Sequence, residues 1–201
     1  INIKLKSHEV IKELAENYNK ANIGLEKESL RFSDQGISGR SHPEELGSPL
    51  TNKFITTDFS EALLEFITPP FFERGDELNF LEDAHYFVHQ SIKDESLWPF
   101  SIAPNTPERN IPIARYGQSN LAQFKKLYRS GLAQRYGKAM QIISGVHFNY
   151  SFSNSYLEEY NLNSSRSNDS SNNEIYLSVL RNIYRNNWLL LYLLGSSPVV
   201  S

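Results

Sequence analysis

The sequence predicts an α+β (α/β) fold in which helices pack on one face of a largely antiparallel sheet. Segments with helical periodicity alternate irregularly with a few segments of strand periodicity, and no internal repeat is visible. Hydrophobic residues make up 39% of the 201 residues, enough for one substantial core. Charged residues make up 21%, so the composition is neither that of a membrane protein nor that of a disordered chain.

The N-terminal half contains two expected helices and two segments with other character. Residues 4–20 and 76–94 carry apolar side chains at helical spacing, and the second of these is clearly amphipathic. Between them, residues 24–32 have the composition of a strand. Residues 54–68 stop at Pro69, because proline continues neither a helix nor a central strand.

The C-terminal half begins with a proline-rich connection over residues 99–112. Ser119 is then a typical N-cap for a helix. The apolar side of this helix carries Leu121, Phe124, Leu127, Tyr128 and Leu132. Residues 144–152 alternate as a strand does, and the Ser- and Asn-rich residues 161–173 predict a flexible surface loop. Residues 174–194 predict a last helix, apolar nearly all round at its end and therefore buried.

Charge and cysteine content exclude several functions. A formal net charge of −3 argues against a protein that coats nucleic acid. The absence of cysteine excludes disulfides, thiolate-bound zinc and a cysteine nucleophile, and is compatible with the cytoplasm. No apolar leader segment is visible, and the longest apolar run, residues 188–194, is shorter than a membrane span. The chain lacks an initiator Met and stops soon after an apolar helix, so we expect a part of a longer enzyme.

The first strand carries two carboxylates on one face. Glu26 and Glu28 are two residues apart, and side chains at that spacing point to the same side of a strand. Carboxylates so close repel one another unless a divalent cation lies between or beside them. A solvated strand face is the simpler alternative.

The segment of residues 54–68 also presents acidic side chains. As a strand, its second half places Glu61 and Glu65 on one face; as a helix, it places Asp58 beside them. The β-branched ends and the prolines favour a strand, although the spacing fits both. An ordinary amphipathic element would show the same pattern.

The strand at residues 144–152 has an apolar and a polar face. Its apolar face is expected in the core, so His147 projects to the opposite, polar side. A single histidine is more often structural than a ligand. Three segments with such polar faces nevertheless fit a sheet lined with oxygen and nitrogen ligands, which favours Mg²⁺ or Mn²⁺.

Other candidate sites are weaker. His85 and His89 lie one helical turn apart, a spacing that zinc sites use, but a solvated helix face explains them more simply. The helix that follows Ser119 is locally basic and includes Arg129, which suits either phosphates or solvent. Neither a Gly-x-x-x-x-Gly-Lys loop nor a Gly-x-Gly-x-x-Gly turn occurs, so a nucleotide would be held in another way.

Several long stretches resemble the bacterial stand-alone type of glutamate–cysteine ligase, in matching order and spacing. The stretches are residues 24–31, 42–48, 55–69, 116–120, 124–137 and 143–149. The resemblance covers essentially the whole chain except the Ser/Asn-rich loop. It implies a glutamine-synthetase-like fold, with a curved sheet whose concave face holds the active site, and makes residues 1–201 the N-terminal portion of one catalytic domain. It also implies that ATP and Mg²⁺ drive the ligation of cysteine to the γ-carboxylate of glutamate through a γ-glutamyl phosphate, the first step of glutathione biosynthesis.

The resemblance also implies roles for individual residues. The positions that match metal ligands, together with the neighbouring aspartate, are Glu26, Glu28, Asp58, Glu65 and His147. The positions that match the cysteine pocket are Phe59, Tyr128, Leu132 and Gln141. Arg129 matches an arginine that faces the ATP phosphates. The remaining glutamate- and ATP-binding residues are expected beyond Ser201, so the isolated chain is expected to be inactive.

Four alternatives stay open at this point. The chain fits the ligase half of a bifunctional glutathione-synthesising enzyme, or the same chemistry with another amine acceptor. A non-catalytic module, in which the carboxylates are only surface charge, predicts that no property depends on magnesium. A metal-dependent hydrolase is less favoured, because nothing outside the matched motifs supplies a pair of residues that activates water.

Overall fold

The computed structural model describes residue 12, residues 21–158 and residues 168–195. The helix expected at residues 4–20 lies almost wholly outside this range. The chain divides into two compact units, residues 1–151 and residues 152–201.

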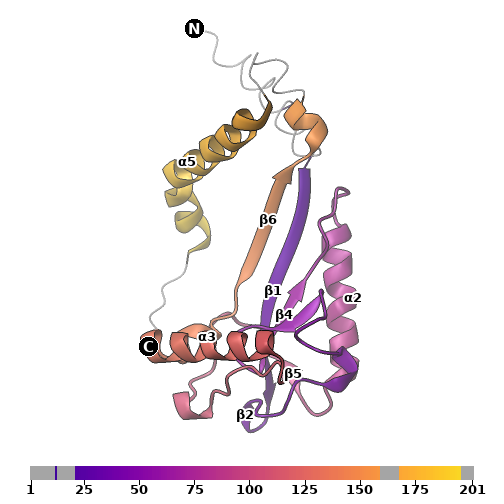
Figure 1. Cartoon of the computed structure of the whole chain (residues 1–201), viewed down its shortest axis with the longest axis vertical. Coiled ribbons are helices and arrows are strands. Elements are labelled where there is room, and N and C mark those ends of the chain that lie inside the picture. The colour runs from indigo at the N-terminus through magenta and orange to yellow at the C-terminus, as the bar shows by residue number, and fades with distance from the viewer. Residues whose placement is uncertain (1–11, 13–20, 159–167, 196–201) are drawn as a thin grey trace. The chain divides into compact units, whose positions relative to one another are not determined.

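The first unit is built around one long strand, β1 (Ala21–Ser33), which pairs with four others (Figure 1). The sheet is six-stranded, and the pairings of β1 with β2, β4 and β5 and of β3 with β4 are antiparallel. The other strands are β2 (Gly36–Ile37), β3 (Ile55–Thr57), β4 (Leu63–Ile67), β5 (Ser96–Leu97) and β6 (Val146–Phe152). The predicted antiparallel sheet is therefore confirmed.

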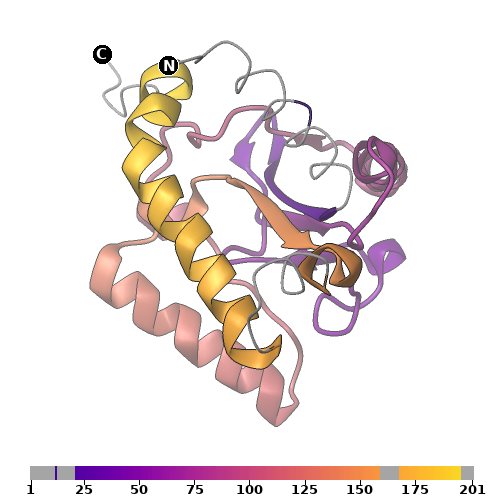
Figure 2. The same ribbon diagram turned by 90° about the horizontal axis from the view of Figure 1, so that it is seen from above.

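Two helices lie on opposite sides of these strands (Figure 2), rather than on the one face expected from the sequence. Helix α2 (Asp76–Ser91) packs on one sheet face, where Ala84 and Val88 join Leu64 and Phe66 in a buried cluster. Helix α3 (Asn120–Tyr136) begins at Ser119, whose hydroxyl accepts a hydrogen bond from the Ala122 backbone at 3.2 Å, as the N-cap prediction required. Short 3₁₀ helices occupy Glu44–Leu46, Glu108–Asn110 and Ala139–Ile142.

The opposite sheet face changes from apolar to acidic along β1. At one end, Leu30 lies opposite Leu63 of β4, and both are fully buried in a second apolar cluster with Phe59. Two and four residues earlier on the same face come Glu28 and Glu26. The apolar end of this face is therefore part of the core, and the two carboxylates lie just beyond the second apolar cluster.

Residues 54–68 form two strands joined by a tight turn, which decides between the strand and helix interpretations. Strands β3 and β4 pair with Ile55 opposite Phe66 and Thr57 opposite Leu64. Glu61 falls in the turn and does not share a face with Glu65, because the turn breaks the alternation on which that expectation rested.

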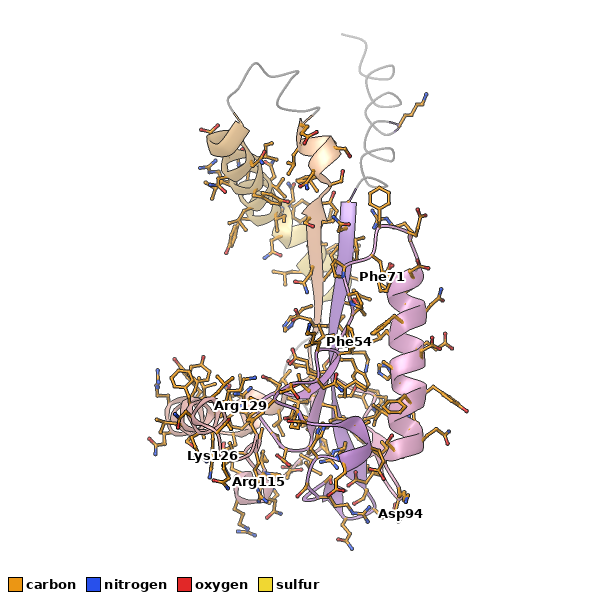
Figure 3. The ribbon with its side chains drawn as sticks, turned by 45° about the vertical axis from the view of Figure 1, so that its right-hand side comes forward. Phe54, Phe71, Asp94, Arg115, Lys126 and Arg129 are labelled. Carbon is orange, nitrogen blue, oxygen red and sulfur yellow. The ribbon has the colours of Figure 1, made fainter. Side chains whose placement is uncertain are left out.

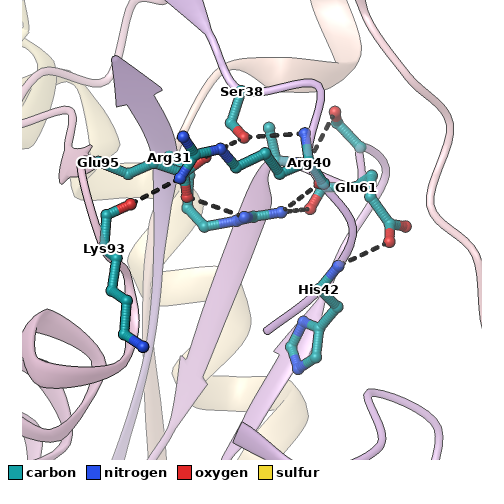
Figure 4. Close-up of polar contacts among 9 residues, drawn as sticks. Arg31, Ser38, Arg40, His42, Glu61, Lys93 and Glu95 are labelled. Atoms are coloured by element: carbon teal, nitrogen blue, oxygen red, sulfur yellow. Dashed lines mark hydrogen bonds and ion pairs between the residues drawn. The ribbon is translucent and has the colours of Figure 1, made fainter. Parts of the chain in front are cut away.

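Glu61 is instead a buried acceptor for two backbone N–H groups. It is 3% exposed and receives bonds from His42 at 2.9 Å and Arg115 at 2.7 Å. A neighbouring buried ion pair joins Arg31 of β1 to Glu95 at 2.9 Å (Figure 4). Arg31 also donates to the Glu61 carbonyl at 2.9 Å, so one polar network fixes the ends of several strands.

Some apolar surfaces that the sequence placed in the core are exposed in the described residues. The apolar face of β6 was expected to be buried, but Val146 and Phe148 are exposed. On α3, Leu121, Phe124, Leu127 and Tyr128 are also exposed. Only Leu132 and Ala133 of that helix pack against the second apolar cluster. Periodicity identified these faces correctly but says nothing of what covers them.

The second unit consists mainly of helix α5 (Asn168–Leu194). The helix begins at Asn168 rather than at Glu174, so the end of the predicted loop is helical. Its apolar C-terminal part is exposed, including Trp188 and Leu194, and the prediction of burial is wrong for the described chain. None of the described helices combines the length and apolar character needed to cross a bilayer.

We expect Phe66→Ala to lower the free energy of unfolding by about 3–5 kcal/mol, because the ring is fully buried between the sheet and α2. Chemical denaturation measures this loss. The matched control is Phe72→Ala, whose ring is 46% exposed and whose loss is expected to be much smaller. Equal losses for both variants would contradict the packing described here.

Candidate metal and substrate site

Three adjacent strands bring the predicted ligands to one face of the sheet. Glu28 of β1 lies directly opposite Glu65 of β4, and Glu26 is two residues away on the same side. Strand β6 pairs with β1 and contributes His147. Asp58 follows directly after β3 and adds a further carboxylate. We call Glu26, Glu28, Asp58, Glu65 and His147 the acidic cluster.

Glu26 holds the β6 side of the cluster together. Its Oε2 lies 3.1 Å from Nδ1 of His147, and its Oε1 accepts a hydrogen bond from the Asn149 amide at 2.9 Å. One ligand atom from each of Glu26, Glu65 and His147 lies within 4.8 Å of the others, a spacing compatible with a shared metal ion.

Glu28 is fixed by the backbone that leads into β6. Its Oε2 accepts a hydrogen bond from the Gly145 N–H at 2.8 Å, and its own N–H donates to the Gly145 carbonyl at 3.0 Å. These two bonds join β1 to the start of β6. The Gly145 N–H binds only Oε2 of Glu28. The other carboxylate oxygen, Oε1, belongs to the same sheet face as Glu65.

The electrostatics of the cluster show an excess of negative charge. The pKa of Glu65 is raised to about 7, chiefly by burial and then by the charges of Asp58, Glu28 and Glu26, while His147 opposes the rise. Burial is also the main cause of the raised pKa of Glu28, opposed mostly by the Gly145 N–H. Crowded carboxylates of this kind are stabilised as anions by a bound cation.

The residues present therefore fit a divalent cation. The donors are carboxylate oxygens with one imidazole nitrogen, a set that suits Mg²⁺ or Mn²⁺. Glu26, Glu65 and His147 have the geometry to hold such an ion, and Glu28 and Asp58 lie close enough to influence their charge.

Arg129, predicted to face phosphate, lies beside Asp58. Its Nε donates to the Asp58 carbonyl at 2.6 Å, and its Nη2 is 3.6 Å from the Asp58 carboxylate. The guanidinium also rests on the ring of Tyr116, 4.8 Å from its centroid. Figure 3 labels Arg129 and Lys126 on the same helix; Lys126 is exposed, whereas the Arg129 side chain is 13% exposed. The arginine thus belongs to the edge of the acidic cluster.

The residues predicted for a cysteine pocket are only partly brought together. Phe59 is buried in the second apolar cluster, and Leu132 packs against the same cluster. Tyr128, one helical turn before Leu132, is exposed, and Gln141 is half-buried. Phe59 and Leu132 therefore share one apolar cluster, whereas Tyr128 is exposed to solvent in the described part of the chain.

Sequence reasoning missed two residues that shape the site. Asn149 lies two residues after His147 and holds Glu26; the alternation of β6 placed it on the polar face, a signal that could have identified it. Tyr116 had no such signal, because its contacts come from distant parts of the chain. His85 was expected on a solvated face, but its ring stacks on Phe66 with 4.0 Å between centroids, whereas His89 is exposed.

Two solved structures share this fold and define the class of protein. A glutamate–cysteine ligase from Francisella tularensis in complex with AMP has a TM-score of 0.82 and 39% identity, covering 89% of this chain and 36% of that one. A bifunctional glutathione synthetase from Pasteurella multocida has a TM-score of 0.81 and 33% identity, covering 94% of this chain and 25% of that one. The fold is that of ligases of glutathione synthesis.

Sequence comparison gives the family. Residues 8–201 match the family model described as glutamate–cysteine ligase, so the chain belongs to the glutamate–cysteine ligase family. Relatives of that name are 44% identical over 186 residues in Aliivibrio fischeri strain MJ11 and 45% identical over 183 residues in Pseudomonas putida strain W619. The alignments cover 91% and 88% of this chain but only 36% and 34% of those relatives, about a third of their length.

We expect Glu65 to make the metal-free protein less stable as pH rises from about 4.5 to about 7. An ordinary glutamate has a pKa near 4.5, whereas the folded protein holds that of Glu65 at about 7. Between those values the folded state binds the proton and the unfolded state does not, so the stabilisation present below pH 4.5 is lost as pH approaches 7. Urea denaturation with a chelator, at several pH values, measures this change.

The variant for this experiment is Glu65→Gln, which removes the titration and should flatten the pH dependence over that interval. Glu82→Gln on the exposed surface of α2 is the matched control and should leave the wild-type profile unchanged. A Glu65→Gln profile parallel to that of the wild type would refute the raised pKa.

Proposed function

We propose that this chain is the N-terminal part of an ATP-dependent, ADP-forming glutamate–cysteine ligase that makes γ-glutamylcysteine. The observation that carries the proposal is the acidic cluster on one sheet face, in a chain whose family and structural neighbours are glutathione-synthesis ligases. An enzyme of this kind handles a phosphorylated carboxylate, and phosphoryl transfer depends on neutralising crowded oxygens.

The proposed reaction has two steps. A γ-carboxylate oxygen of glutamate attacks the γ-phosphorus of ATP, and the bond to ADP breaks to leave γ-glutamyl phosphate. The cysteine amine then attacks the acyl carbon, loses a proton and expels phosphate, which forms the amide. Bound Mg²⁺, or Mn²⁺, supplies charge neutralisation on the phosphate oxygens.

The residues of this chain have distinct roles in that scheme. The acidic cluster binds and orients the cations, with Asn149 holding Glu26 and Gly145 holding Glu28. Arg129 supplies a positive charge at the edge of the cluster, where the transferred phosphoryl group passes. The proposed cysteine pocket is formed by Tyr128 and Gln141 next to the apolar cluster that contains Phe59 and Leu132.

The remainder of the enzyme is needed to complete the site. Because the chain matches about a third of the length of its relatives, we place the residues that bind glutamate and adenine in the polypeptide outside it. We expect the complete enzyme to be cytoplasmic, with glutamate, cysteine and ATP as its small-molecule substrates. Nucleic acid and membranes are not among the proposed partners.

A second candidate is the ligase half of a bifunctional glutathione-synthesising enzyme. The neighbour from Pasteurella multocida supports it, at 33% identity. The identities of 44–45% to relatives named simply glutamate–cysteine ligase favour the stand-alone form. The length of the complete polypeptide distinguishes the two.

The first test is an assay of the complete enzyme with ATP, Mg²⁺, glutamate and cysteine, reading γ-glutamylcysteine by mass. We expect product only when all four components are present, and none from the isolated 201-residue chain. A folded, magnesium-loaded complete enzyme that forms no product would refute the cysteine ligase and leave another acceptor or a non-catalytic module.

In the complete enzyme, we expect Glu28→Gln to reduce ligation at least about 100-fold while leaving the fold intact. The change keeps the size of the side chain but removes a carboxylate from the centre of the acidic cluster. Steady-state rates and circular dichroism measure the two effects. Glu82→Gln is the matched control, and similar rates for both variants would remove Glu28 from the proposed site.

A further inference from the structure

Tyr116 lies against both Asp58 and Arg129, although nothing in the proposed reaction uses it directly. We propose that Tyr116 is a positioning residue that holds the Asp58 backbone and the Arg129 guanidinium in place at the edge of the acidic cluster. The proposal deepens the proposed function and rests on it for the role of Arg129.

The tyrosine hydroxyl binds the chain at the point where it leaves β3. It is 2.5 Å from the Thr57 carbonyl and 2.9 Å from the Asp58 carbonyl, so its proton is shared between two consecutive carbonyl groups. Tyr116 is 5% exposed, and water has little access to replace this donor. The hydroxyl therefore fixes the backbone from which the Asp58 carboxylate projects.

The tyrosine ring supports the Arg129 guanidinium, which also binds Asp58. The Arg129 guanidinium lies 4.8 Å from the ring centroid, within the range of a cation–π contact. The Arg129 Nε donates to the Asp58 carbonyl at 2.6 Å, the carbonyl that the tyrosine hydroxyl also approaches. Hydroxyl and ring thus act on one carbonyl by separate routes.

Tyr116 itself is held rigidly. Two residues earlier, the Ala114 N–H donates to the Phe59 carbonyl at 3.0 Å. The adjacent Arg115 N–H donates to the buried carboxylate of Glu61 at 2.7 Å. Residues 113–116 therefore run along the turn that begins at Asp58, and a side chain held this way pre-organises what it touches.

The two parts of the side chain have separable consequences. Removing the hydroxyl takes the tyrosine donor from the Thr57 carbonyl and leaves the Asp58 carbonyl with the Arg129 Nε donor, so the Asp58 carboxylate is less well placed beside Glu65. Removing the ring as well takes away the support of Arg129. The first change is expected to weaken cation binding alone, and the second to weaken nucleotide binding too.

The test is Mn²⁺ titration of the complete enzyme, followed by electron paramagnetic resonance, with thermal melts of every variant. We expect Tyr116→Phe to raise the Mn²⁺ dissociation constant about 3- to 10-fold, the range for loss of one buried hydrogen bond, without raising the KM for ATP. Tyr116→Leu should raise both. The matched control is Tyr86→Phe on the exposed face of α2, which should change neither.

A double-mutant cycle separates this role from simple core packing. In an Asp58→Asn background, Tyr116→Phe should change Mn²⁺ affinity by less than about 2-fold, because its effect passes through Asp58. A packing role would lower the melting temperature and leave the affinity of the folded enzyme unchanged. Arg129→Lys, which keeps the tyrosine but loses the Nε donor, should weaken Mn²⁺ binding by a similar factor and tests the same link if Tyr116→Phe does not fold.

The outcomes distinguish this inference from the proposed function. Unchanged Mn²⁺ affinity in Tyr116→Phe, or independent effects in the cycle, would overturn the positioning role and leave the ligase standing. If Tyr116→Phe weakens Mn²⁺ binding relative to the wild type, but the wild type forms no γ-glutamylcysteine, the positioning role is sustained and the ligase is overturned. A wild-type enzyme that binds no Mn²⁺ would overturn the metal site and the positioning role together.

Discussion

The pairing of β1 with β4 is the constraint on which the rest of the structure depends. Their register places Leu30 opposite Leu63 and Glu28 opposite Glu65, so the pair that stabilises the sheet and the pair that repels lie two residues apart. Burial of Leu30 and Leu63 stabilises the sheet. The same register holds the carboxylates of Glu28 and Glu65 close together although they repel each other. The raised pKa of Glu65 follows first from its burial and then from the charges of Asp58, Glu28 and Glu26.

The two faces of β1 have different roles: one packs under α2, and the other carries the carboxylates of the acidic cluster. Lys27 and Ser29 point to the side covered by α2, where the lysine donates to the serine hydroxyl at 2.5 Å and burial lowers the lysine pKa. Glu26 and Glu28 point to the side that α2 does not cover. Positive and negative groups of one strand are thus separated by the thickness of the sheet, and the acidic face keeps its excess charge.

The sequence predicts the local elements well because their causes are local. The alternation in β1 and β6, the apolar stripe of α2 and the Ser119 cap each depend on residues a few positions apart. Local patterns could not predict that Glu61 lies in a turn and away from the acidic face. Its position is fixed by hydrogen bonds from the backbone N–H groups of His42 and Arg115, which are distant in sequence. Tyr116 was not identified from the sequence for the same reason, because its hydroxyl contacts Thr57 and Asp58, which are distant in sequence. The exposure of α3, β6 and α5 shows a further limit, since periodicity identifies an apolar face but not its covering.

The position of Glu26, Glu28 and Leu30 on alternate residues of one strand also restricts how this segment can change through evolution. A substitution in β1 alters one side chain, but a slip of β1 by one residue against β4 would move every β1 side chain to the other face of the sheet. The slip would turn Lys27 and Ser29 towards the site and bury both glutamates under α2. It would put the positive charge of Lys27 beside Glu65 in place of two carboxylates and set those carboxylates against the apolar cluster under α2. A one-residue insertion or deletion inside β1 is therefore expected to damage the site and the core together, whereas a substitution there changes one face only.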